Sequence, residues 1–104
     1  MIERHVVFHL QPGAAQAFDS FFQSSYGPAL AHQPGFFGAE LLRPQDDSET
    51  LVLVLRFSGV DAAQAWRESA KHKELSPRLK ELYQSSDVRV HDVLAVQPGP
   101  GPSL

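Results

Sequence analysis

The 104-residue sequence contains no cysteine. Disulfide bonds, thiolate nucleophiles, iron–sulfur clusters and zinc sites with thiolate ligands are therefore excluded. Positive charge is also scarce, because nine lysines and arginines are scattered among twelve acidic residues and leave a net charge of -3. A protein that follows a phosphate backbone needs a basic stripe, so we expect no nucleic acid partner.

Long apolar runs and phosphate-binding motifs are absent as well. No run approaches the roughly 20 apolar residues that cross a bilayer, and Met1 to Arg4 lead directly into a strand-like segment, without the pattern of a signal peptide. No glycine-rich phosphate loop or dinucleotide-binding fingerprint occurs, which leaves nucleotide cofactors without support. We therefore expect a cytoplasmic protein with no membrane partner.

The sequence does contain four segments with the composition of β-strands. Residues rich in β-branched and aromatic side chains, bounded by turn-forming residues, occupy 5–10, 36–43, 50–57 and 87–96. The second and third of these segments should form a hairpin. The stretch 51–55 is apolar at every position, which is typical of a strand that is buried on both faces.

Helical spacing of apolar residues appears in two places between these strands. The first covers residues 14–25, and the Gly27-Pro28 pair should interrupt it before a second short helical piece. The other begins at Asp61, where a glutamine three residues later completes a capping box. A new helix should then start at Ser76-Pro77, with the serine as cap and the proline as first residue.

In chain order these elements are β-α-β-β-α-β, the arrangement of an α+β ferredoxin-like sandwich whose helices pack on one face of a four-stranded antiparallel sheet. Such packing leaves the other sheet face bare, although the strands carry apolar residues on both faces. A second copy of the chain would cover it, so we expect a homodimer packed sheet to sheet. The domain should span residues 1–96, and the proline- and glycine-rich tail, residues 97–104, should be disordered.

The candidate site centres on Trp66, the only tryptophan, and on His72. On a continuous helix the neighbours of the indole on its face are small, namely Ala62, Ala63, Ser69 and Ala70. The indole therefore either fills the core or lies beside space for a flat aromatic ligand. His72 follows at about 240° around an ideal helix, so it can join Trp66 only if the helix breaks, which we expect within residues 70–75.

Histidines of the first strand are further candidates. His5 and His9 share one face of that strand, with Cα atoms about 13 Å apart, so they cannot chelate one ion as a pair and we expect no metal site. His5 suits a general base, because an imidazole titrates near neutrality. His91 and Asp92 are adjacent on a strand and point to opposite faces, which argues against a dyad between them.

Two stretches match a known family. Residues 33–43, QPGFFGAELLR, and residues 65–72, AWRESAKH, resemble the antibiotic biosynthesis monooxygenase domain family of dimeric α/β barrels. The resemblance extends over about residues 1–96. It implies a pocket between the sheet and the helices of each protomer, and a dimer made by the other sheet face. Because the family includes cofactor-independent, quinone-forming enzymes, our leading hypothesis is a monooxygenase that oxidises a small aromatic or quinol-type substrate with O2.

On this hypothesis aromatic side chains hold the substrate ring and a histidine removes a proton. The catalytic candidates are His72 and His5, and the substrate-binding candidates are Trp66, Phe18, Phe22, Phe36 and His9. No cofactor is expected, because such substrates can reduce O2 themselves once they have lost a proton.

Three alternatives stay open. The first strand, residues 2–13, looks more like the stress-responsive dimeric α/β barrel family, in which a plant polyketide cyclase uses a histidine pair at the places of His5 and His72. The haem-degrading members of the family suggest a second alternative, haem binding with His72 as the iron ligand. Those members carry an asparagine on the first strand, whereas the residues that we expect to face the pocket on this strand include His5 and His9. A dimeric small-molecule binder without any reaction is the third alternative.

Overall fold

The computed structural model describes residues 1–102. Its helices and strands follow the predicted order, with the two helical regions each built from more than one piece. Their bounds are β1 Ile2–Leu10, α1 Ala15–Phe21, the π-helical η1 Phe22–Tyr26, α2 Gly27–Leu30, β2 Phe36–Leu42, β3 Thr50–Phe57, α3 Val60–Glu68, α4 Ala70–Glu81 and β4 Tyr83–Asp92.

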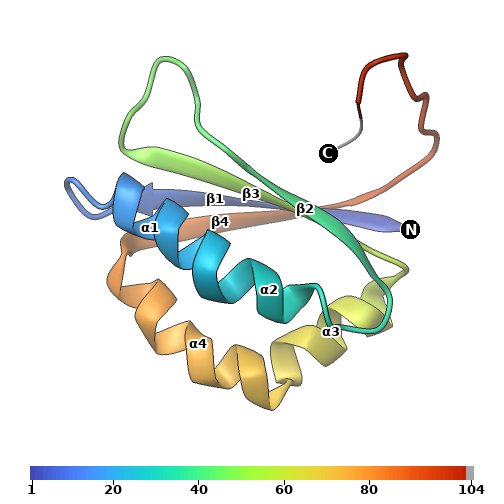
Figure 1. Cartoon of the computed structure of the whole chain (residues 1–104), viewed down its shortest axis with the longest axis horizontal. Coiled ribbons are helices and arrows are strands. Elements are labelled where there is room, and N and C mark those ends of the chain that lie inside the picture. The colour runs from blue at the N-terminus through green and yellow to red at the C-terminus, as the bar shows by residue number, and fades with distance from the viewer. Residues whose placement is uncertain (103–104) are drawn as a thin grey trace.

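The strands form one antiparallel sheet in the order β2-β3-β1-β4. All helices lie on one face of this sheet, whereas the β2–β3 connection and the C-terminal segment extend on the other side (Figure 1). This arrangement confirms the ferredoxin-like α+β fold. Val6 of β1 lies between Leu53 of β3 and Val88 of β4, which places these side chains on the same sheet face.

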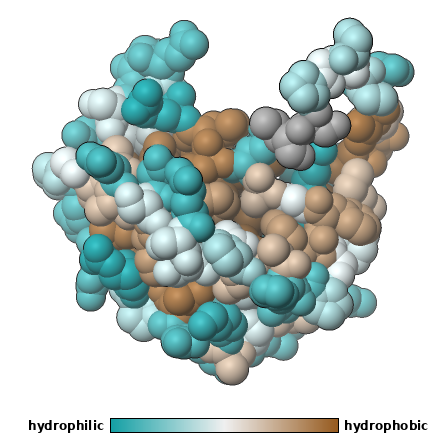
Figure 2. Space-filling model, viewed as in Figure 1, coloured by the Kyte–Doolittle hydropathy of each residue, from teal (hydrophilic) through white to brown (hydrophobic). Residues whose placement is uncertain are grey.

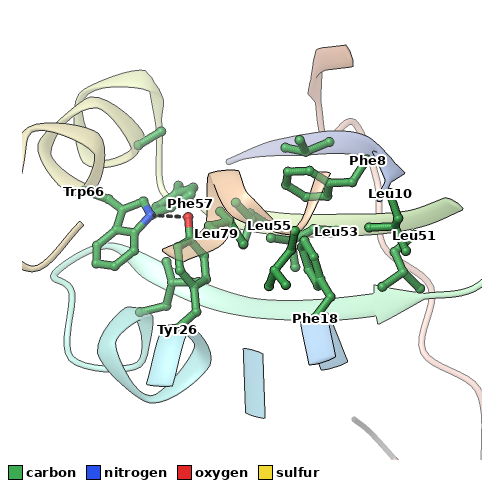
Figure 3. Packing of buried hydrophobic residues seen from close by; sticks show 14 of the residues in the cluster. Phe8, Leu10, Phe18, Tyr26, Leu51, Leu53, Leu55, Phe57, Trp66 and Leu79 are labelled. Carbon is green, nitrogen blue, oxygen red and sulfur yellow. Dashed lines mark hydrogen bonds between the residues drawn. The ribbon is translucent and has the colours of Figure 1, made fainter. Parts of the chain in front are cut away.

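The core fills the space between the helices and the sheet. Because side chains alternate along a strand, every second one points toward the helices, and the helices contribute bulky aromatic and aliphatic side chains to the same core (Figure 3). The fully buried large side chains are Trp66, Phe18, Phe57, Leu30 and Leu53. These residues fix the distance between the layers and hence the walls of any pocket between them.

The opposite face of the sheet, which we call the open face, is mixed in character. On β1 it presents Glu3, His5, Val7 and His9, and on β3 it presents Val52, Val54 and Arg56. Figure 2 shows hydrophobic surface in the hollow between the two projecting segments, interrupted by polar groups. The prediction that both faces are apolar therefore holds for β3, but on β1 the open face is mainly polar.

The backbone stays helical through Gly27-Pro28, so the predicted interruption is wrong, but the predicted second short helical piece exists as α2, with Pro28 in its first turn. The chain passes from α1 through the π-helical turn into α2, and the amide of Gly27 donates to the carbonyl of Phe22 five residues earlier. A proline has no amide to donate, and the wider turn accommodates it without ending the helix. A Cβ on Gly27 would lie 2.9 Å from the Phe22 carbonyl oxygen, which explains a glycine at this turn.

The second helical region also differs from the prediction. Helix α3 starts after Gly59, and the side chain of Gln64 bonds to Glu68, so there is no capping box. Helix α4 starts directly after Ser69 and continues through Pro77, which therefore does not begin a helix. The extended backbone of Ser69 (ψ 150°) and its side-chain cap end one helix and begin the next at a single residue.

Strand β4 begins four residues earlier and ends four residues earlier than the predicted segment 87–96. Residues 93–102 form no helix or strand, although the amide of Val93 still donates to the carbonyl of Met1. The predicted disordered tail begins within this segment, and its last two residues lie outside the described part of the chain. Within residues 1–102, no helix has the length and apolar character needed to cross a membrane.

Candidate functional site

A pocket of about 230 Å³ lies between the sheet and helices α3 and α4. Its floor comes from β1 and β3 and is apolar apart from Arg4, and β4 lines one side of it. The polar and aromatic side chains that line it come from six elements and include Arg4, Tyr26, Trp66, Arg67, His72 and Lys80. Among the residues that the structure describes, no aspartate or glutamate lines this pocket.

Three rings meet at one end of the pocket. The centroids of Trp66 and His72 are 5.2 Å apart, and those of Tyr26 and Trp66 are 5.4 Å apart, with the rings close to perpendicular in both pairs. The indole Nε1 of Trp66 donates to the Tyr26 hydroxyl at 3.3 Å (Figure 3). Trp66 is only 1% exposed, so its indole packs in the core and at the same time forms a wall of the pocket.

Ser69 is the residue that brings His72 to Trp66. Its hydroxyl donates to the carbonyl of Trp66 at 2.7 Å and accepts from the amide of His72 at 3.1 Å. The chain direction therefore changes between the two rings, and His72 occupies the first turn of α4 and not a sixth position along α3. The predicted break exists and has the predicted effect on His72, but it falls one residue before the predicted range of 70–75.

The environment of the site shifts two pKa values in opposite directions. Burial lowers the pKa of His72 below 6.5; a hydrogen bond to the backbone of Arg67 opposes this, and the positive charges of Lys80, Arg4 and Arg67 lower the pKa further. Burial raises the pKa of the Tyr26 hydroxyl above 10. At neutral pH the site therefore contains a neutral imidazole that can accept a proton and a phenol that can donate a hydrogen bond.

The same pocket collects positive charge. Arg4 is half-buried, its Nε atom is buried without a hydrogen-bond partner within residues 1–102, and burial together with the charge of Arg67 lowers its pKa. Neither Arg4, Arg67 nor Lys80 takes part in an ion pair of the described residues.

The sequence reasoning missed Arg4 and Tyr26. Extending the strand alternation back from Val6 would have placed Arg4 on the helix side of the sheet.

The two candidate histidines of β1 lie on the open face, away from the pocket. His5 Nε2 donates to Glu3 at 2.6 Å and its ring centroid lies 4.7 Å from that of His91, whereas His9 Nε2 contacts Asp87 at 3.0 Å. The β1 residues that line the pocket are Arg4, Val6 and Phe8. They lie on the strand face that carries the larger apolar side chains, and this face packs against the helices. The expectation that His5 and His72 share one site is therefore corrected: within one protomer the sheet separates them.

The three candidate phenylalanines do not line the pocket. Phe18 is fully buried against Phe8, with ring centroids 4.9 Å apart, and Phe36 packs on Phe57 at 5.5 Å. Phe22 lies 6.4 Å from Tyr26 and so supports the pocket only from behind. Of the predicted substrate-binding residues, Trp66 alone lines the pocket.

Other possible sites lack the residues or the space that catalysis, metal binding or haem binding would need. A wider depression of about 870 Å³ at the edge between α1 and β2 is lined by residues such as Gln16, Asp19 and Arg43, and it contains no aromatic ring and no histidine. Within residues 1–102, no group of three potential ligands could hold a metal ion. Haem does not fit the helix-side pocket, because its volume lies below the roughly 300–1,000 Å³ of pockets for drug-sized ligands and a porphyrin would have to separate the helices from the sheet.

The fold and the site thus define a ferredoxin-like α+β protein with a small, aromatic-walled pocket under its helices. The family model of the antibiotic biosynthesis monooxygenases matches residues 1–78, and the chain belongs to this family. A search of curated proteins found no significant match.

Solved structures of the same fold come from several organisms. The cofactor-independent oxygenase SnoaB from Streptomyces nogalater is 22% identical, with a TM-score of 0.82, and the alignment covers 94% of this chain and 97% of SnoaB. The protein NE2512 of unknown function from Nitrosomonas europaea is 19% identical, with a TM-score of 0.77 and coverage of 96% and 95%. A conserved protein from Methanosarcina mazei is 16% identical, with a TM-score of 0.76 and coverage of 86% and 89%. At these identities the likeness concerns the fold.

Proposed function

We propose that this protein is a cofactor-independent monooxygenase that oxidises a small hydroxylated aromatic substrate with O2. The observation that carries the proposal is the position of His72, which has a lowered pKa and faces a pocket walled by Trp66 and Tyr26. Membership of the antibiotic biosynthesis monooxygenase family supports the reaction class. The description of SnoaB as a cofactor-independent oxygenase shows that the fold is used for such chemistry elsewhere.

The proposed reaction begins with proton transfer. Neutral His72 takes the hydroxyl proton of a naphthol-type substrate, and the positive charges of Arg4, Arg67 and Lys80 stabilise the resulting anion. The electron-rich anion transfers one electron to O2, and the two radicals combine to form a carbon–oxygen bond at the ring position para to the oxygen. The imidazolium of His72 returns its proton to the resulting peroxide, and the hydroperoxide then loses water across its O–O bond and the adjacent C–H bond. One oxygen atom stays in the quinone, the other leaves as water, and the substrate supplies all four electrons.

Oxygen uptake by the wild-type protein tests this proposal. We expect 1-naphthol or 1,5-dihydroxynaphthalene to be converted to the corresponding naphthoquinone with one O2 consumed per product, and one atom of ¹⁸O2 to enter the quinone. Chelator should not change the rate, and no quinone should form without oxygen. A cyclised product that forms anaerobically from a polyketide substrate would favour the cyclase alternative, whereas binding with no turnover of any phenol would favour a simple binding protein.

We also propose that the open face of the sheet joins two copies of the chain. Supporting this, Val7, Val52 and Val54 form an apolar centre on that face, and no helix of the described residues covers it. Sedimentation equilibrium should therefore give about twice the 11.5 kDa mass of one chain. Val52→Asp should shift the protein to the monomer mass, whereas Val60→Asp, at an exposed position on α3, should not. A monomer mass for the wild type at micromolar concentration would refute the dimer.

A further inference from the structure

The charge of the helix-side pocket is not balanced by the protein. Three cationic side chains, Arg4, Arg67 and Lys80, line one small cavity, and no acidic side chain of the described residues lines it with them. Arg67 and Lys80 are exposed and can remain hydrated at the rim. Arg4 is different, because its side chain comes from the sheet beneath the helices and its Nε is cut off from solvent without a partner.

A buried donor on a charged group is unfavourable unless an acceptor pairs with it. The protein could have supplied that acceptor, as it does for Arg56, whose Nε donates to Glu3 at 2.7 Å on the open face. At Arg4 no such carboxylate is present in the described chain. The guanidinium fork matches a carboxylate in a two-bond geometry that a single neutral hydroxyl cannot reproduce. An unpaired arginine inside a pocket therefore points to an anionic ligand.

We propose that the substrate is a hydroxylated aromatic carboxylate, whose carboxylate binds Arg4 while its ring lies against Trp66 and its hydroxyl faces His72. The proposal rests on the proposed function only in taking this pocket as the active site. The carboxylate is a permanent charge and is separate from the oxygen that loses its proton in the reaction. It supplies the charge balance that a neutral naphthol lacks before it is deprotonated.

The carboxylate also has an effect on the base. The charges that face His72 are those of Lys80, Arg4 and Arg67, all of which lower its pKa, and the nearby hydroxyl of Tyr26, whose pKa is raised by burial, is neutral near pH 7. A negative group bound among these cations offsets their repulsion of the imidazolium. Binding of the acid should therefore raise the pKa of His72, whereas binding of a neutral ring of equal shape should not.

Isothermal titration calorimetry with a matched pair of ligands tests the proposal. The pair is 1-hydroxy-2-naphthoate and 1-hydroxy-2-naphthamide, which share a ring and differ in charge, and both are titrated under nitrogen so that no turnover occurs. We expect the acid to bind the wild type at least about tenfold more tightly, as for a charge-assisted hydrogen bond. Arg4→Gln should reduce this preference to about threefold or less. Arg78→Gln, which removes an equal charge on the outer side of α4, should leave the preference intact.

Equal affinity for acid and amide, no binding of either ligand, or an unchanged preference in Arg4→Gln would overturn the proposal. If Arg4→Gln does not fold, NMR titration of His72 in the wild type decides instead: the acid must raise the pKa of His72 and the amide must not. The two proposals fail separately. A protein that prefers the acid but never consumes O2 refutes the oxygenase and keeps the carboxylate site, whereas one that oxidises 1-naphthol without preferring the acid does the reverse.

Discussion

We expect His72→Ala to lower kcat for oxidation of the substrate by about 10²–10⁴-fold, the usual contribution of a general base. The reason is that His72 is the only histidine that lines the pocket in the described part of the chain, and its lowered pKa keeps it neutral at pH 7. Steady-state oxygen uptake measures the loss. The fold should remain intact, since the imidazole is partly exposed and the cap at Ser69 bonds the backbone amide of residue 72 and not its ring.

The matched control is His5→Ala on the open face, where the sheet separates the imidazole from the pocket. We expect this variant to retain its kcat within about threefold, because removing a surface contact does not alter the proton acceptor. Equal and large losses in both variants would contradict the site described here. That result would instead favour a histidine pair contributed across two protomers, as the cyclase alternative requires.

The pH dependence of kcat/KM tests the same assignment of His72 as the base. A base must be unprotonated to act, so log(kcat/KM) should rise with pH through the pKa of free-enzyme His72, which lies below 6.5, and level off near neutrality. His72→Ala should lose this acidic limb. Lys80→Gln should move the limb to higher pH, because the ammonium group is one of the charges that lower the pKa of His72. A profile in His72→Ala that keeps the wild-type limb would assign the base to another group.

Periodicity alone was enough to predict the fold. Four strand-like segments and two helical regions in the order β-α-β-β-α-β allow few arrangements, and the observed structure has the expected four-stranded antiparallel sheet with its helices on one face. The sequence pattern predicted the start of a helix less well where two possible cap residues competed. Ser69 and Ser76 are both good helix caps, and Pro77 favoured the second, but a proline in the interior of α4 was tolerated and the first was used.

The candidate site was harder to predict, since it depends on which face of β1 meets the helices. Both phases of that strand contain apolar residues, and the one with Phe8 and Leu10 is buried because it carries the larger side chains. This choice moves His5 out of the pocket and Arg4 into it. Tyr26 was missed for another reason. It lies in a π-helical turn, which changes the direction in which its side chain points, and a period of 3.6 residues does not account for that change.

Trp66→Ala should cause the largest loss of stability of any single change at the site. We expect the free energy of unfolding to fall by about 3–5 kcal/mol, because a fully buried indole leaves a cavity and the Tyr26 hydroxyl loses its donor. Such a loss is a large part of the roughly 5–15 kcal/mol that stabilises a domain. Urea unfolding followed by far-ultraviolet circular dichroism measures it, since the variant has no tryptophan fluorescence. Trp66→Phe should lose much less, as it keeps a ring in the cavity.

Phe18→Ala is the control that separates packing from ligand contact. Phe18 is as buried as Trp66 but does not line the pocket, so its truncation should cost a similar free energy of unfolding while the affinity for 1-hydroxy-2-naphthoate stays within about threefold. Trp66→Ala should weaken that affinity at least about tenfold at a temperature where both variants are folded, because the pocket loses one wall and the His72 ring loses the indole that packs against it. Equal affinities in the two variants would reduce Trp66 to a core residue. A Trp66→Ala protein as stable as the wild type would mean that the indole serves the ligand and not the core.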